Sequence, residues 1–171
     1  MLRIFLFGMI VCGLAGYSVA QSPSTVCPLP AEPGAIPAAI DAAITGPADK
    51  DRACMKALFA PEARLVVVDS AADHAADHAA NYTVLTVDDW IARVKPRGHT
   101  LLEEKQVKFD AERFDRIVHL WSTYVLHSDG KQVARGINSI QAIKVSGGWR
   151  VVEILWQAES AATPLPKEFL P

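Results

Sequence analysis

The sequence predicts an α+β domain in which helices pack on one face of a mostly antiparallel sheet. Before about residue 100 the apolar spacing is helical in three stretches, whereas from residue 100 to 159 it is typical of consecutive strands. The tetrapeptides SDGK at 128–131 and SGGW at 146–149 are hairpin turn signals. Helices followed by a run of strands is the layout of an α+β fold.

Three helices are expected in the first half of the chain. Isoleucines recur every four residues within 36–46, which gives a short apolar stripe. The stretch ADKDRACMKALFAPEA, residues 48–63, predicts a second helix that ends at Pro61. Thr86 is placed to cap a third helix over 87–96.

Strand-like segments separate and follow these helices. Residues 64–69 are β-branched and predict a strand, and 82–86 predict a second short one. The longer strands are expected over 100–112, 114–128, 132–146 and 149–159. Together these elements predict one domain over residues 36–160.

The N-terminus has the pattern of an export signal. A basic start precedes a short apolar run, and Ser18 and Ala20 occupy the −3 and −1 positions of a cleavage site before Gln21. We therefore expect residues 1–20 to be removed, 21–35 to form a Pro-rich linker, and 161–171 to form a C-terminal tail. The mature protein is expected to be periplasmic or secreted, with no membrane attachment.

Two cysteines remain after removal of the signal peptide. In an oxidising compartment Cys27 and Cys54 are candidates for a disulfide that would fasten the linker to the domain. The alternative is a buried Cys54 on a helix and a free Cys27. The net charge of −2, without a basic cluster, argues against nucleic acid as a partner.

Two motifs link the chain to a known superfamily. The helix-to-strand junction ALFAPEARLVV and the final hairpin GGWRVVEILW resemble those of the nuclear transport factor 2-like superfamily, and most of all its SnoaL-like branch. The resemblance covers about residues 36–159. It implies a strongly curved sheet that forms a cone, with three N-terminal helices closing it over an apolar pocket. The same fold hosts isomerases, dehydratases, binders and protein-association modules, so function has to come from the site residues.

Strand periodicity and the isomerase pattern together predict which side chains enter the cone. A ligand in the pocket would contact polar groups and one flat aromatic wall. The expected ligand-binding residues are Val67, Ser122, Tyr124, Ser139, Gln141 and Trp156. A slip of one residue along a strand would exchange its two faces.

The isomerase chemistry has no clear counterpart in these residues. The position that matches the proton-abstracting aspartate of the isomerases is Val67, and Gln141 matches their acidic hydrogen-bond donor. Asp69 could serve as a displaced base, alone or with a histidine, and it is the one catalytic candidate. We predict no cofactor.

The segment AADHAADHAA, residues 71–80, places His74 and His78 four residues apart. On a helix this spacing can bind zinc, but the glutamate and third ligand of the zinc proteases are missing from the pattern. These histidines are weak metal candidates, and a duplicated tetrad in a loop explains the pattern as well.

Three functions remain open from the sequence. The preferred one is an exported domain that binds a small apolar ligand without catalysis. The first alternative is a SnoaL-like isomerase, dehydratase or hydrolase that acts on a small cyclic apolar substrate. The second is a protein-association module. The outer sheet face, with His119, Trp121 and His127, is expected to form a homodimer interface.

Overall fold

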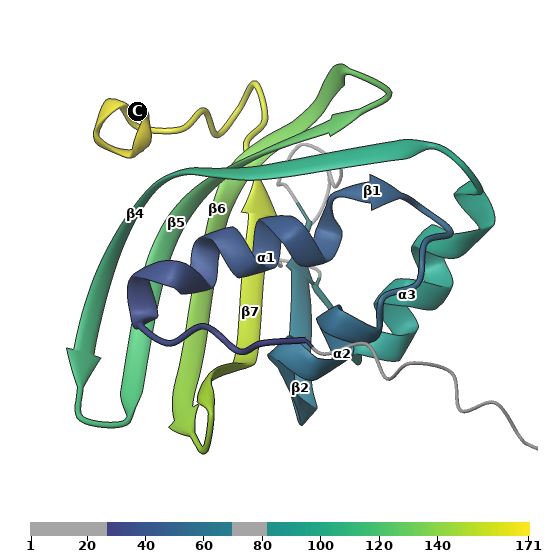
Figure 1. Ribbon diagram of the computed structural model, residues 1–171. Coiled ribbons are helices and arrows are strands. Elements are labelled where there is room, and N and C mark those ends of the chain that lie inside the picture. The colour runs from purple at the N-terminus through teal and green to yellow at the C-terminus, as the bar shows by residue number, and fades with distance from the viewer. Residues whose placement is uncertain (1–26, 70–81) are drawn as a thin grey trace, which may run out of the picture.

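A curved seven-stranded sheet wraps around the helices of the domain (Figure 1). The computed structural model describes residues 27–69 and 82–171. The strands are β1 (Gly46–Pro47), β2 (Phe59–Val68), β3 (Tyr82–Leu85), β4 (Leu101–Phe114), β5 (Ile117–Ser128), β6 (Lys131–Val145) and β7 (Gly148–Ala158). Their order is β1-β4-β5-β6-β7-β2-β3, and every pair is antiparallel except β2 with β7. The predicted α+β class and the curved sheet are confirmed.

Three α-helices precede the long strands, as predicted. They are α1 (Ile36–Ile44), α2 (Ala53–Leu58) and α3 (Val87–Val94). Thr86 caps α3, because its side chain accepts a hydrogen bond from the Asp89 backbone N–H while the Asp89 carboxylate accepts one from the Thr86 N–H. Short 3₁₀ turns lie at Pro33–Ala35, Lys95–Arg97 and Lys167–Phe169.

The second helix is shorter than the sequence predicted. It ends at Leu58, and Phe59 begins β2, where it pairs with Val151 of β7. Pro61 therefore lies within the strand and does not end the helix. Proline has no backbone N–H to donate to a neighbouring strand. The strand tolerates Pro61 because the pairing of β2 with β7 is irregular between Phe59 and Arg64.

Irregular pairing also accounts for the curvature of the sheet. The register shifts between Gln106 and Lys108 of β4, between Leu126 and His127 of β5, and between Gln141 and Ala142 of β6. Such bulges increase the local twist of a strand. Figure 1 shows the result, with β4 arching across the whole molecule.

The core lies between α1, α2 and the concave face of the sheet. Ile36 and Ile40 of α1 are fully buried, as are Leu120 of β5 and Ile140 of β6. Trp149, the second residue of β7, is also fully buried. Among the described residues no helix is long and apolar enough to cross a membrane.

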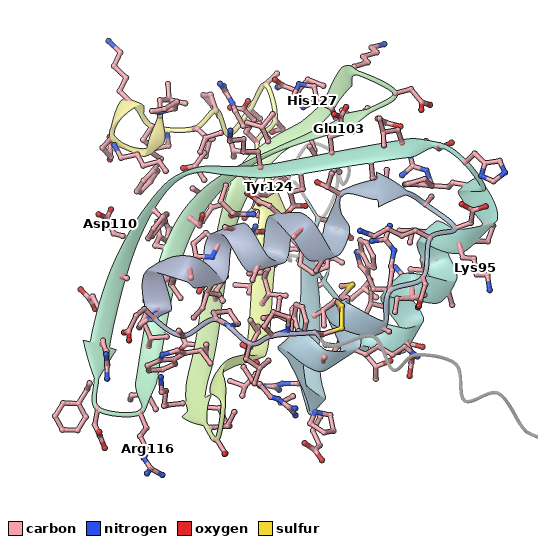
Figure 2. All side chains as sticks on the ribbon, in the orientation of Figure 1. Lys95, Glu103, Asp110, Arg116, Tyr124 and His127 are labelled. Atoms are coloured by element: carbon pink, nitrogen blue, oxygen red, sulfur yellow. A yellow bond between two sulfur atoms is a disulfide. The ribbon has the colours of Figure 1, made fainter. Side chains whose placement is uncertain are left out.

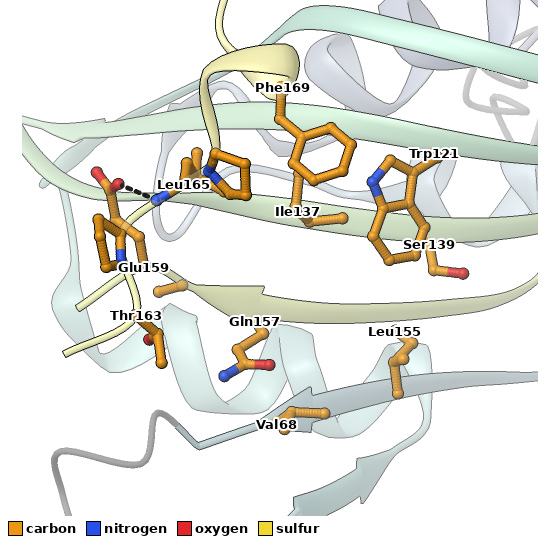
Figure 3. A pocket seen from close by; sticks show the side chains of 13 residues that line it. Val68, Trp121, Ile137, Ser139, Leu155, Gln157, Glu159, Thr163, Leu165 and Phe169 are labelled. Carbon is orange, nitrogen blue, oxygen red and sulfur yellow. Dashed lines mark hydrogen bonds between the residues drawn. The ribbon is translucent and has the colours of Figure 1, made fainter.

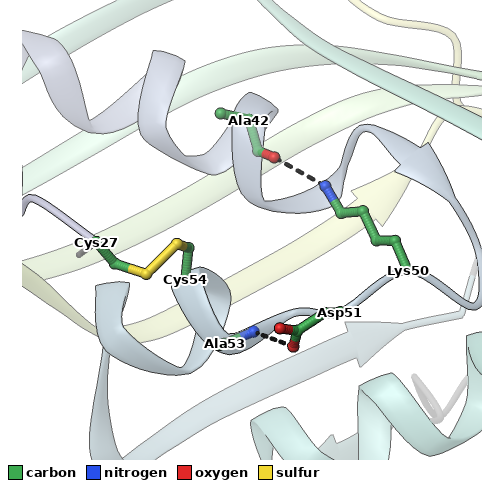
Figure 4. The surroundings of a disulfide bond; sticks show 6 residues. All are labelled: Cys27, Ala42, Lys50, Asp51, Ala53 and Cys54. Atoms are coloured by element: carbon green, nitrogen blue, oxygen red, sulfur yellow. Dashed lines mark hydrogen bonds between the residues drawn. A yellow bond between two sulfur atoms is a disulfide. The ribbon is translucent and has the colours of Figure 1, made fainter. Parts of the chain in front are cut away.

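Covalent and polar links fix the chain around α1 and α2 (Figure 4). A disulfide joins Cys27 to Cys54 of α2, with the two Cα atoms 5.1 Å apart, so the first of the two alternatives for these cysteines is the one observed. Lys50 donates to the Ala42 carbonyl, and Arg52 donates to the carbonyls of Ala43 and Ile44 at 2.7 and 2.9 Å. These cations satisfy the free carbonyls at the end of α1.

Removing the disulfide should destabilise the domain. The bond joins residues 27 positions apart, for which chain entropy gives about 3.5 kcal/mol. The double variant Cys27→Ala/Cys54→Ala should therefore unfold at a lower urea midpoint than the oxidised protein. Dithiothreitol should lower the midpoint of the natural chain to the same extent and leave that of the variant unchanged. Equal midpoints for variant and natural chain would contradict a stabilising role.

Candidate functional site

A cavity of about 260 Å³ lies between the three helices and the concave face of the sheet. Its wall is mostly apolar, which suits a small organic molecule. The polar or charged side chains on it are Arg97, Glu104, Tyr124 and Asn138. The apolar ones include Ile40, Met55, Phe59, Trp90, Leu126 and Trp156. Figure 2 shows the side chains of the domain on the ribbon, with Tyr124 labelled.

Gln106 of β4 is the centre of a hydrogen-bond cluster beneath this cavity. Its side-chain oxygen accepts from the Ser122 hydroxyl at 2.6 Å and from the Asn138 amide at 3.1 Å. Its own amide donates to the Glu104 carboxylate at 2.9 Å. Its backbone N–H donates to both carboxylate oxygens of Asp41 on α1. The Gln106 side chain thus connects β4, β5 and β6 by hydrogen bonds, and the Gln106 backbone N–H connects β4 to α1.

Glu104 carries the most perturbed carboxyl group of the site. Burial raises its pKa to about 8, and the nearby charge of Asp41 adds to the rise, against hydrogen bonds from Asn138 and Gln106. The side chain is only partly shielded from solvent because it borders the cavity. A carboxyl group with a pKa in this range is mainly protonated at neutral pH and can either give or take a proton there.

Tyr124 lines the cavity on the next strand. Burial raises the pKa of its hydroxyl above the ordinary value, and the charge of Glu104 adds a smaller rise. The phenol therefore remains a hydrogen-bond donor at neutral pH. Among the described residues it has no hydrogen-bond partner, and it is free to donate to a molecule in the cavity.

Four of the sequence-predicted ligand residues lie on the concave side. Tyr124 and Trp156 line the cavity itself. Val67 packs against the core next to it. Ser122 also points inward, but it is fully buried and its hydroxyl is used by Gln106 and by the Lys108 carbonyl, so it supports the cluster beneath the cavity.

The predicted facing of β6 is wrong by one residue. Asn138 and Ile140 face the concave side, so Ser139 and Gln141 lie on the convex side. The Ser139 hydroxyl lies 3.1 Å from a ring nitrogen of His119 there. Both faces of β6 carry polar side chains, so alternation alone does not identify the buried face; in the structure Asn138 contacts Gln106, and Ile140 and Ala142 pack in the core.

Ser139 lines a second cavity, of about 320 Å³, between the convex face and the C-terminal tail (Figure 3). Trp121, Ile137 and Leu155 form the sheet side. The tail is attached by a hydrogen bond from Thr123 to the Phe169 carbonyl and by one from Leu165 to Glu159. This cavity is separate from the site around Glu104.

Comparisons with solved structures show the same architecture in other proteins. The beta subunit of a putative aromatic-ring-hydroxylating dioxygenase from Novosphingobium aromaticivorans matches with a TM-score of 0.55 and 15% identity, over 77% of this chain and 94% of its own length. An NTF2-like protein of unknown function from Shewanella baltica matches with a TM-score of 0.50 and 12% identity, over 74% of this chain and 90% of its own. The sequence matches no family model and no curated protein.

This is a nuclear transport factor 2-like fold. The resemblance of the sequence motifs to this superfamily is therefore confirmed at the level of the fold. Identities of this size establish nothing about the reaction or ligand, and the SnoaL-like branch remains a prediction from the motifs.

The predicted catalytic residue and the predicted metal ligands are not among the described residues that line the cavity. Asp69 follows the end of β2 and is not among the cavity-lining residues. His74 and His78 lie outside the described residues. In the ranges 27–69 and 82–171, no group of three or more His, Cys, Asp or Glu side chains could hold a metal ion.

The residues that sequence reasoning missed are Glu104, Gln106 and Asn138. Leu102, Glu104 and Gln106 alternate along LLEEKQVKFD, which places them on one face of a strand. Both faces of this segment are half polar, so the pattern does not identify the buried one. The one indication in the sequence is that Glu104 lies on the same strand face as Leu102 and Gln106, two residues away on either side.

The raised pKa of Glu104 should make the stability of the domain depend on pH. The folded state holds a proton on Glu104 that the unfolded chain has lost above its ordinary pKa of 4.5, so stability should fall as pH rises from about 5 to about 8. Glu104→Gln should remove at least about 1 kcal/mol of that fall. The matched control is Glu103→Gln, at an exposed neighbour on the same strand. Parallel urea-stability profiles for all three proteins would contradict the assignment.

Proposed function

We propose that the domain binds a small apolar ligand in the concave cavity and exchanges a proton with it through Glu104. The observation that carries this proposal is a carboxyl group on the wall of an otherwise apolar cavity, held by two side-chain amides. The sequence alone favoured a binder because no acid or base was expected inside the cone. Glu104 of β4 supplies that group.

Three features support proton transfer over binding alone. The pKa of about 8 lets both protonation states of Glu104 be present near neutral pH, which is the condition for efficient general acid–base catalysis. Tyr124 can donate a hydrogen bond to an oxygen on which negative charge develops. The Gln106 cluster fixes the carboxyl group in place, so little reorganisation is needed.

The chemistry best matched to these groups is proton abstraction next to a carbonyl. The Glu104 carboxylate takes a proton from the carbon beside a ketone, the electron pair of that C–H bond moves toward the carbonyl oxygen, and Tyr124 donates a hydrogen bond to the resulting enolate. The proton then returns to carbon from Glu104. We therefore propose an isomerase-type activity toward small cyclic apolar substrates.

Export and homodimer formation also remain proposals. Export is supported by the disulfide between Cys27 and Cys54, because such bonds persist in oxidising compartments. A dimer through the convex face is supported by the exposure of Trp121 and Leu155, which are 40% and 38% accessible. The C-terminal tail already covers part of that face.

The proton-transfer proposal can be tested with 2-tetralone, a bicyclic ketone of suitable size. In deuterated buffer the natural protein should accelerate hydrogen–deuterium exchange beside the carbonyl by about 10²-fold or more, and the rate should rise through about pH 8. Glu104→Gln should return exchange to the solvent rate, whereas Glu103→Gln should keep it. Proton NMR measures both exchange and, by saturation transfer, binding. Binding without acceleration would contradict the catalytic role of Glu104.

A further inference from the structure

Arg97 lies at the rim of the cavity that holds Glu104. It ends the 3₁₀ turn Lys95–Arg97, which connects α3 to β4. Of the described residues that line this cavity, it is the one whose side chain is exposed. A ligand that enters the cavity from solvent would therefore have its outer end beside this guanidinium.

The position of Arg97 is fixed by contacts on both sides. Its guanidinium donates to the Ser128 hydroxyl at 2.9 Å, at the end of β5. Its backbone carbonyl accepts from the Thr100 hydroxyl at 2.9 Å. Gly98 follows with φ +60°, a conformation that glycine adopts without strain and that turns the chain into β4. The guanidinium is thereby kept near the cavity opening.

Arg97 also has no acidic partner within residues 27–69 and 82–171. Three other arginines of the described residues do have one: Arg64 pairs with Glu153, Arg113 with Glu32, and Arg135 with Glu159. A guanidinium has five N–H donors, and Arg97 uses one side-chain contact, to an uncharged hydroxyl. The remaining donors are available to an anion in a bidentate arrangement.

We propose that Arg97 binds the carboxylate of the ligand, and that the ligand is a small apolar carboxylic acid. This inference rests on the proposed function of the cavity and adds the class of molecule. The apolar body would lie against Trp90, Leu126 and Trp156, and the carboxylate would remain at the solvent-exposed rim. An inward carboxylate is disfavoured, because it would be buried beside Glu104, where the described lining of the cavity holds no cation other than Arg97 at the rim.

A matched pair of probes tests the charge preference directly. 2-Naphthoate and 2-naphthamide share one ring system and differ in charge, and their binding can be followed by their fluorescence. The natural protein should bind naphthoate at least ten-fold more tightly than naphthamide, and added salt should reduce this preference. Arg97→Gln should abolish the preference without weakening naphthamide binding, and Arg97→Lys should retain part of it.

Arg93→Gln is the matched control, because Arg93 is an exposed arginine on α3 that does not line the cavity. It should bind both probes as the natural protein does. Equal affinity of the natural protein for the two probes would overturn the anion proposal and leave the cavity proposal standing. Equal loss of naphthoate binding in Arg93→Gln and Arg97→Gln would overturn it as well. If neither probe binds the natural protein, both proposals fail.

Discussion

The arrangement of the site depends on the hydrogen bonds of Gln106. A polar group in an apolar interior is costly unless all of its atoms are paired, and a carboxyl group more so. Gln106 meets this requirement by accepting from Ser122 and Asn138 while it donates to Glu104. The cluster draws residues from three adjacent strands and, through Asp41, from α1. It explains how an acidic side chain is kept within a core that is otherwise built from isoleucine, leucine and aromatic residues.

The curvature of the sheet is what brings this cluster next to a cavity. The pairing of β4 with β5 shifts immediately after Gln106, and that of β6 with β7 shifts after Gln141. The concave side of the bent sheet is too wide for α1 and α2 to fill completely, and a space of about 260 Å³ remains. Glu104 and Tyr124 border this space, while Arg97 stands at its solvent end. The site therefore has a polar inner end, apolar walls and a cationic rim.

Much of the fold followed from local patterns, while the site did not. The hairpin at SDGK has positive φ at Asp129 and Gly130, as its turn chemistry requires, and Thr86 caps α3 as expected. Tyr124 and Trp156 could be predicted to line the cavity, because β5 and β7 each have one mainly apolar face. In β4 and β6 both faces are half polar, so side-chain alternation could not decide between Asn138 and Ser139 or reveal Glu104. Those choices are made by contacts between strands that are distant in sequence, and Gln106 to Asn138 spans 32 residues.

The central claim is that Glu104 is a protonated carboxylic acid at neutral pH because of where the fold holds it. It can be measured by following the side-chain carboxyl carbons of glutamate by ¹³C NMR as a function of pH, with the Glu104 signal assigned by its loss in Glu104→Gln. We expect its titration midpoint at about 8, well separated from those of the exposed glutamates. A midpoint near the ordinary value of 4.5 would mean that Glu104 is a solvated carboxylate, and the proposed chemistry would lose its basis.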